Sequence, residues 1–191
     1  MKRLATMLAV LCLALAVMML VSCGSDELIR SETSAGLNGG FELTQDGYPI
    51  NWAFGPNPET LPSYQVSVDT TRVAEGSKSL RIVSTQDNQT KAFRSVRVPI
   101  GQGREYRIAF SVISKGCSLR VNRIVMNAWG TTNMRSQIIA QTSEITVAWV
   151  TFEEILIPAE GEALVLLIFL VDGVGTLWCD DVRIEEYAPQ D

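Results

Sequence analysis

The stretch Glu105–Ile113, EYRIAFSVI, indicates the fold class, because apolar and other residues alternate along it. The apolar residues Tyr106, Ile108, Phe110 and Val112 fall on one face of an extended chain. This period of two is typical of a β-strand that buries one face and exposes the other.

Short runs of the same kind recur from Gly39 onward, and no long stretch shows helical periodicity. Turn residues separate these runs, among them SKG at 114–116 and DGVG at 172–175, where we expect breaks between strands. The pattern predicts an all-β fold, a two-sheet antiparallel β-sandwich of about ten strands. The other main runs are SYQVSV (63–68), LRIVS (80–84), AFRSVRVPI (92–100), SLRVNRIVMNAW (118–129), SQIIAQT (136–142), WVTFEEILI (149–157), ALVLLIFLV (163–171) and TLWCDDVRIEEY (176–187).

The run Ala163–Val171 is apolar on both alternating faces, whereas a strand with one wet face should alternate. It is too short to cross a bilayer as a helix. Two explanations are open: a central strand covered on both sides, or an exposed apolar patch for a partner or a ligand.

The first residues have the pattern of a signal segment, with basic Lys2 and Arg3 followed by an apolar run. The sequence LVSC at Leu20–Cys23 resembles the lipobox of bacterial lipoproteins. That resemblance implies a signal peptide over residues 1–22, a lipidated tether over 23–37 and a folded domain over 38–188. Acyl chains such as palmitate on Cys23 would anchor the chain in the cell envelope, in the outer membrane or at the cell surface if the source is Gram-negative. The alternatives are a plain transmembrane anchor, or a signal peptide with an incidental cysteine.

Charge and composition exclude several functions. The formal net charge is −5 and no basic run is present, so nucleic acid is not an expected partner. The chain has no histidine, which removes Ser-His and Cys-His catalysis and the usual zinc hydrolase ligands. Glu153 and Glu154 are adjacent on a predicted strand and should point to opposite faces, so they cannot flank one glycosidic bond.

Two cysteines, Cys117 and Cys179, lie in the predicted folded domain. In an oxidising compartment they can form a disulfide, and the equal alternative is a pair of buried free thiols. Their spacing excludes a CxxC redox motif or a zinc ribbon.

Six segments in order resemble the carbohydrate-binding modules of the cenC type, which belong to the galactose-binding-like jelly rolls. They are NGGFE (38–42), GYPINW (47–52), EGSKSLRI (75–82), GREYRIAF (103–110), VAWVTFEEILIP (147–158) and GTLWCDDVRI (175–184). The resemblance implies a structural calcium ion between the first and last strands. Its ligands would be Glu42, the backbone around Ser77 and Lys78, and the Asp180/Asp181 pair, which suits the preference of calcium for oxygen. The alternative is that Glu42 caps backbone amides and the aspartates are solvated.

The tryptophans divide into two groups. Trp52, Trp149 and Trp178 match positions of that family that pack against the sandwich, whereas Trp129 does not. We expect Trp129 to form a stacking platform for a sugar ring, with hydrogen-bonding groups nearby in sequence. These are Asn127, Arg135 and Gln137, and Tyr64 is a second candidate platform. The alternative is that Trp129 is one more packed aromatic.

Three kinds of function are consistent with these features. The sequence favours a non-catalytic, lipid-anchored protein of the cell envelope whose domain binds glycans. The alternative is a structural or assembly lipoprotein that binds a protein partner through the same sandwich. An enzyme with atypical residues is the third, because fold alone does not fix function.

Overall fold

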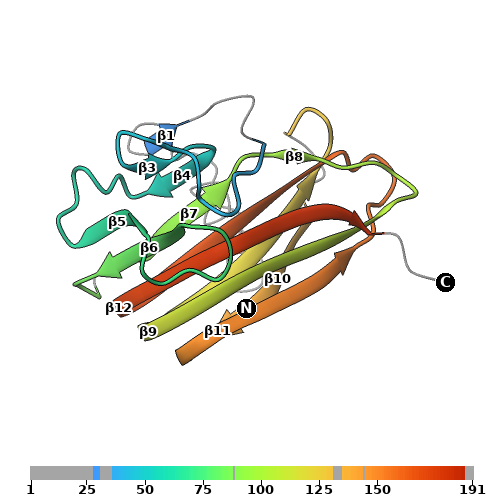
Figure 1. Cartoon of the computed structure of the whole chain (residues 1–191). Coiled ribbons are helices and arrows are strands. Elements are labelled where there is room, and N and C mark those ends of the chain that lie inside the picture. The colour runs from blue at the N-terminus through green and yellow to red at the C-terminus, as the bar shows by residue number, and fades with distance from the viewer. Residues whose placement is uncertain (1–27, 31–35, 88, 131–134, 144, 188–191) are drawn as a thin grey trace, which may run out of the picture.

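The structure is a computed structural model that describes residues 28–30, 36–87, 89–130, 135–143 and 145–187. Every regular element in these ranges is a β-strand (Figure 1). No helix within them is long and apolar enough to span a membrane. The strands are β1 (Leu28–Arg30), β2 (Thr44–Gln45), β3 (Tyr48–Pro49), β4 (Trp52–Gly55), β5 (Tyr64–Asp69), β6 (Ser79–Ser84), β7 (Lys91–Ser95), β8 (Val98–Pro99), β9 (Glu105–Met126), β10 (Arg135–Thr142), β11 (Ile145–Leu156) and β12 (Leu164–Tyr187).

A long antiparallel ribbon of β9 and β12 forms the centre of the molecule (Figure 1). The two strands pair from Tyr187 opposite Glu105 to Leu164 opposite Met126. The predicted breaks at 114–116 and 172–175 are therefore wrong. The two glycine-containing segments lie opposite each other in the ribbon, where the register shifts between Gly173 and Thr176.

The ribbon folds back on itself at this corner. Phe169 of β12 pairs with Val121, which lies eleven residues beyond Phe110 along β9. In a straight strand that separation would be about 36 Å. The ring centroids of Phe110 and Phe169 are nevertheless 5.2 Å apart, in a T-shaped contact. The two halves of the ribbon must therefore face each other across the core.

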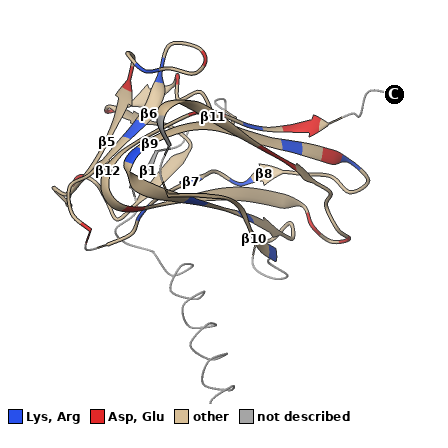
Figure 2. Cartoon of the chain, turned by 90° about the horizontal axis from the view of Figure 1, so that it is seen from below, with Lys and Arg blue, Asp and Glu red and all other residues tan. Residues whose placement is uncertain are grey.

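This fold-back divides the strands into two layers (Figure 2). The first half of β9 and the second half of β12 carry β11 on one side and β6 and β5 on the other, which we call the β11 layer. The other halves carry β10, β8 and β7, with β4 and β1 beyond β7, which we call the β10 layer. The all-β antiparallel sandwich predicted from the sequence is confirmed.

The core lies between the layers and is rich in aromatic rings. Trp52 is fully buried between Phe41, Phe93 and Phe169, as expected for a packing residue. Its indole Nε1 donates a hydrogen bond to Asn38 O at 3.0 Å. A buried indole N–H with a partner avoids the cost of an unpaired polar group.

The apolar run Ala163–Val171 is covered on both faces, as one of the two explanations predicted. Val165, Leu167, Phe169 and Val171 point into the core, and none of them is exposed. Leu166 and Leu170, on the opposite face, are also buried, each with 6% of its surface exposed. The run lies in β12, between β9 on one side and β7 and β8 on the other. It does not form an exposed patch.

A substitution at the corner of the ribbon tests the fold-back directly. A Cβ atom on Gly175 would lie 2.2 Å from Lys115 O and 2.6 Å from Cys117 N, both rigid backbone atoms. We expect Gly175→Ala to lower the free energy of unfolding by about 2 kcal/mol or more, because the crossing backbones must separate. Gly55→Ala, which meets no atom within 4 Å, is the control. Equal stability of the two variants in urea denaturation would contradict this account of the corner.

Candidate functional site

Trp129 is presented to solvent by a tight turn between β9 and β10. Gly130 N donates to Asn127 O at 3.0 Å and Trp129 N donates to Asn127 Oδ1 at 3.1 Å, so the asparagine holds the turn from both its backbone and its side chain. Gly130 has a positive φ of 70°, which a glycine adopts without strain. The indole is 83% exposed, so Trp129 is not a packed aromatic.

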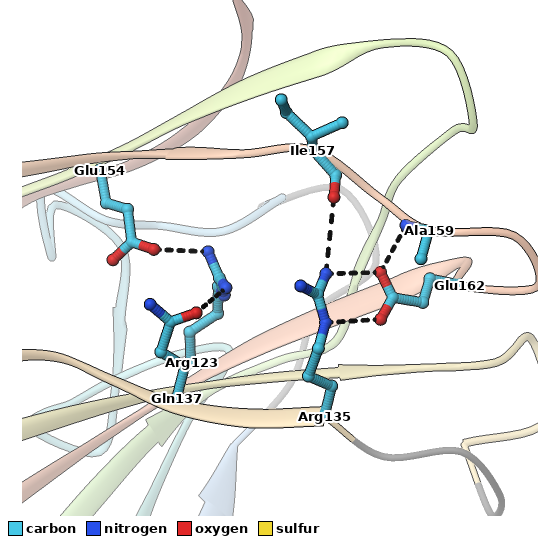
Figure 3. A network of polar contacts seen from close by, with 7 residues as sticks. All are labelled: Arg123, Arg135, Gln137, Glu154, Ile157, Ala159 and Glu162. Atoms are coloured by element: carbon cyan, nitrogen blue, oxygen red, sulfur yellow. Dashed lines mark hydrogen bonds and ion pairs between the residues drawn. The ribbon is translucent and has the colours of Figure 1, made fainter.

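Charged side chains surround the base of this turn. The exposed guanidinium of Arg97 lies against Gly130, because a Cβ there would be 2.9 Å from Arg97 Nη1. Arg135, at the start of β10, makes a two-point ion pair with Glu162 through Nε at 2.9 Å and Nη2 at 2.8 Å (Figure 3). We call this group, Trp129 with Asn127, Arg97, Arg135 and Glu162, the Trp129 end.

Glu162 is held in its ionised form at this end. Burial alone would raise the pKa of its carboxyl, but the hydrogen bonds from Arg135 and from Ala159 N lower it below its usual value. Ala159 N donates to Glu162 Oε2 at 2.7 Å. The loop after β11 is thereby tied to β10 of the other layer.

A second ion pair crosses the sandwich beside the first (Figure 3). Arg123 of β9 points inward and is 3% exposed, and its Nη1 donates to Glu154 of β11 at 2.7 Å. Its Nη2 donates to Gln137 Oε1 at 2.6 Å. Burial lowers the pKa of Arg123, so the pair with Glu154 compensates for lost hydration. Gln137 was predicted to contact a ligand, but its side-chain oxygen already accepts a hydrogen bond in this network.

The structure therefore brings part of the predicted ligand surface together. One end of the sandwich holds Trp129, Asn127 and Arg135. Gln137 lies two residues beyond Arg135 along β10. Arg97 and Glu162 were missed by sequence reasoning, because both come from loops distant in sequence. Glu153 is exposed while Glu154 points inward, as the alternation predicted.

Tyr64 is not a platform, and that prediction is wrong. Its ring is fully buried, and its hydroxyl donates to Ala92 O at 3.0 Å. Burial raises the pKa of this hydroxyl. Tyr64 begins β5, and its place in the core comes from β5 pairing with β6, which a short local pattern does not show.

Trp178 faces out of the sandwich, although it was expected to pack. It lies between Leu177 and Cys179, which point into the core, so alternation places its ring on the outer face of the β11 layer. The guanidinium of Arg72 stands 4.7 Å from the ring centroid, and Nε1 donates to Asp69 Oδ2 at 2.8 Å. We call this region the Trp178 face.

Asp69 holds the rim of the Trp178 face through several hydrogen bonds. Burial alone would raise the pKa of this carboxyl, but donors from Trp178 and from the Thr71 hydroxyl and amide lower it to about 2. The lowered pKa means that Asp69 is charged in the folded protein, where it orients the indole and caps the turn at Thr71.

Glu42 and Asp180, both predicted to bind calcium, accept hydrogen bonds from opposite ends of the loop at 74–78. We call this arrangement the loop clamp. Glu42 Oε1 accepts hydrogen bonds from Ser77 N at 2.6 Å and Lys78 N at 3.1 Å, and the Ser77 hydroxyl donates to Oε2. The hydroxyl and amide of Ser77 lower the pKa of Glu42. Glu42 therefore caps backbone amides, as the alternative to calcium predicted.

Asp180 acts in the same way from the other end of the loop. Its Oδ2 accepts from Ala74 N at 2.7 Å and Glu75 N at 3.1 Å, and its Oδ1 accepts from Asp181 N at 2.7 Å. Asp180 is fully buried, and this burial raises the pKa of its carboxyl despite the three donors. Asp181 instead forms an ion pair with Arg183 at 3.0 Å, so the Asp pair is not simply solvated.

This donor set does not fit a calcium ion. Calcium needs roughly six to eight oxygen atoms that converge on it, whereas here N–H groups of the loop point at both carboxylates. In the ranges that the structure describes, no three or more acidic, cysteine or histidine side chains are arranged to hold a metal ion. Calcium binding remains a prediction from the resemblance, and the proposed function does not depend on it.

Cys117 and Cys179 are buried free thiols, so the structure shows the second of the two alternatives and not the disulfide. Burial raises the pKa of both thiols, which makes them poor nucleophiles. Cys23 lies outside the described residues.

No protein-family model matches the chain, and no curated protein matches it. Solved structures do match in fold. A xylan-binding domain, the first family 22 carbohydrate-binding module of a Paenibacillus barcinonensis xylanase, has a TM-score of 0.52 at 14% identity, over 80% of this chain and 94% of that domain. A family 61 module in complex with β-1,4-galactotriose has a TM-score of 0.52 at 16% identity, over 78% and 96%.

A part of an enzymatically active protein matches the fold as well. The enzymatically active domain of tailspike protein 4 from bacteriophage CBA120 matches with a TM-score of 0.58 at 14% identity, over 83% of this chain. This chain spans only 22% of that protein's length. At such identities the matches establish the fold alone, an antiparallel β-sandwich similar to that of these carbohydrate-binding modules.

The loop clamp gives a test of the calcium prediction. Asp180→Ala leaves three backbone N–H groups without their acceptor, so we expect the free energy of unfolding to fall by about 3 kcal/mol or more. Glu160→Ala, on an exposed loop, should leave it unchanged. The clamp needs no metal, so the melting temperature of the wild type should be the same in calcium and in EDTA. A lower melting temperature in EDTA would restore the calcium site.

Proposed function

We propose that this protein is a non-catalytic binder of glycans, and that the ligand lies at the Trp129 end. The observation that carries the proposal is the 83% exposed indole of Trp129, held by a turn that uses two hydrogen bonds to Asn127. Exposing a large aromatic ring to water is unfavourable, and a sugar ring stacked on it would remove that surface from water.

The groups around Trp129 suit a polyhydroxylated ligand. Arg97 and Arg135 supply N–H donors, and Asn127 supplies an oxygen acceptor. Arg135 and Glu162 neutralise each other, and the exposed Arg97 adds one positive charge to this end. The two modules compared above are described as binding xylan and β-1,4-galactotriose, so neutral β-1,4-linked polysaccharides are the first class to test.

The carboxylates at this end support binding and not hydrolysis. Glycosidases need one carboxyl group with a raised pKa as general acid. Glu162 has a lowered pKa and an arginine partner, and Glu154 is joined to Arg123. Neither carboxyl has the environment of a general acid.

We also infer that Cys23 carries the lipid anchor, which would place the domain in the cell envelope. The support is the LVSC sequence at the end of the apolar run. We expect the wild type, expressed in a bacterium, to incorporate a labelled palmitate analogue and to sediment with membranes. Cys23→Ser should lose the label. Labelling of Cys23→Ser would show that another site is acylated, and absence of label from both would contradict the lipoprotein.

Trp129→Ala tests the glycan site. Loss of a central stacking aromatic should cost about 2 kcal/mol of binding free energy, a rise in Kd of roughly thirtyfold. The melting temperature should not change, because the indole is exposed. Affinity electrophoresis on xylan, galactan and β-glucan gels would measure both the ligand class and the loss.

Trp178→Ala is the matched control, because Trp178 is the other tryptophan with an established outward face. We expect it to retain glycan binding. If Trp178→Ala abolishes binding and Trp129→Ala does not, the glycan lies on the Trp178 face and the site is misplaced. If the folded wild type is not retarded by any glycan, the proposed function itself falls.

A further inference from the structure

The strand β1 attaches the start of the chain to one edge of the β10 layer. It pairs with β4 in an antiparallel arrangement that places Leu28 opposite Phe54. β4 pairs with β7 and β7 with β12, so β1 lies at the outer edge of this layer (Figure 1). Cys23 lies five residues before Leu28, so the two residues are at most about 18 Å apart when the chain is fully extended.

The register of the layer gives the direction from which the chain enters β1. One row of paired residues crosses the layer: Leu28, Phe54, Phe93, Phe169 and Val121. Arg30 belongs to the row of Trp52 and Ser95, which lies nearer the Trp129 end. From Arg30 back to Leu28 the backbone therefore runs toward the corner of the ribbon. The chain enters β1 from the side of the corner.

The corner and the Trp129 end lie on opposite sides of this row. From Val121, β9 runs five residues back to Gly116 at the corner and five residues forward to Met126. Each distance is about 17 Å along a strand. A membrane surface at the corner is therefore within the reach of Cys23, because the backbone of β1 already points there. A membrane surface at the Trp129 end would require the chain to reverse and then to span a similar distance and the turn beyond it.

The tip of the corner presents an apolar side chain beside a basic one. Val174 is 52% exposed, and Lys115 is exposed on the opposite strand. The two backbones are in contact here, because a Cβ on Gly116 would lie 2.8 Å from Val174 O. An apolar side chain with a basic neighbour suits the boundary between lipid headgroups and acyl chains. There a lysine stem lies along the apolar region while its ammonium group reaches phosphate.

A polar hollow lies next to this tip and is lined in part by Ser118, Arg120, Ser143 and Asp172. Arg120 is exposed, and its guanidinium supplies paired donors for a phosphate group. Asp172 accepts a hydrogen bond from the Thr90 hydroxyl at 2.5 Å and supplies a carboxylate for an ammonium group. A phospholipid headgroup that carries both a phosphate and an ammonium group has the complementary charges.

We propose that the corner of the ribbon faces a lipid bilayer, with Val174 and Lys115 at the headgroups and the Trp129 end directed away. The inference rests on the proposed lipid anchor at Cys23. The anchor supplies the affinity for the membrane, and the short chain between Cys23 and β1 selects the orientation. Ten residues of β9 separate Gly116 from Met126, so the Trp129 end stands about 34 Å from the bilayer. A glycan outside the membrane can reach it there.

The test measures which end of the domain is close to lipid. The full chain carries Cys12→Ser and is expressed in a bacterium. The membrane-bound protein is reconstituted in vesicles of phosphatidylethanolamine and phosphatidylglycerol. Val174→Cys carries a fluorescent probe at the corner. Ile157→Cys is the matched control, because Ile157 is a similarly exposed apolar residue whose carbonyl accepts a hydrogen bond from Arg135 at the Trp129 end.

The other thiols do not interfere with this measurement. Cys117 and Cys179 are buried, and acylation removes the thiol of Cys23. Label found on the parent chain, which has no added cysteine, is subtracted.

We expect a lipid with a nitroxide on its headgroup to quench the probe at position 174 strongly and the probe at position 157 weakly. Lys115→Glu combined with Arg120→Glu should remove at least half of the quenching at position 174, because each basic residue near an anionic surface contributes about 1 kcal/mol. Arg104→Glu should not change it, since Arg104 lies just before β9 begins, at the other end of the sandwich.

Two results would overturn the inference while leaving the anchor in place. The first is a membrane-bound protein whose two probes are quenched equally, or whose probe at position 157 is quenched more. The second is quenching at position 174 that Lys115→Glu with Arg120→Glu leaves unchanged, which would exclude contact of the corner with headgroups. Failure of the anchor gives a different result: the protein would not sediment with membranes, and the anchor and the orientation would both be wrong.

Discussion

The fold-back of the β9–β12 ribbon is the constraint on which the rest of the structure depends. Gly116 and Gly173 adopt positive φ values of 81° and 89° at the corner, and Gly175 allows the backbone of β9 to approach. Because the ribbon returns on itself, Phe110 and Phe169 meet, and one pair of strands supplies the middle of both layers. Every other strand of the ten-stranded sheet is then added to one half of the ribbon or the other, directly or through a neighbouring strand.

The same fold-back explains why two ion pairs lie between the layers. It places β10 and β11 on the same side of the ribbon but in opposite layers. Arg123 and Glu154 join the two layers there with a paired charge. Such a pair contributes little net stability, because lost hydration offsets the attraction. The ion pair fixes the distance between the edge strands β10 and β11, and so the positions of Gln137 and Arg135.

Local sequence patterns predicted the strands well and their connections poorly. Alternation located β5, β6, β10 and β11, since it reports which face of a strand is buried. The turn signals at 114–116 and 172–175 were interpreted as the ends of strands. A glycine shows that the chain can bend, but it does not show that two bends lie opposite each other within one continuous pair of strands. The loop clamp shows the same limit. The family resemblance placed Glu42 and Asp180 beside one loop, but only the backbone direction decides whether N–H groups or carbonyl oxygens face them.

The Trp129 end is built on the turn after β9 and on the loop that joins β11 to β12. Both segments leave the ribbon at the same end, where Ala163 N donates to Met126 O at 2.9 Å. The ribbon that forms the core therefore also brings together the groups that we propose to bind a glycan, although they come from segments distant in sequence.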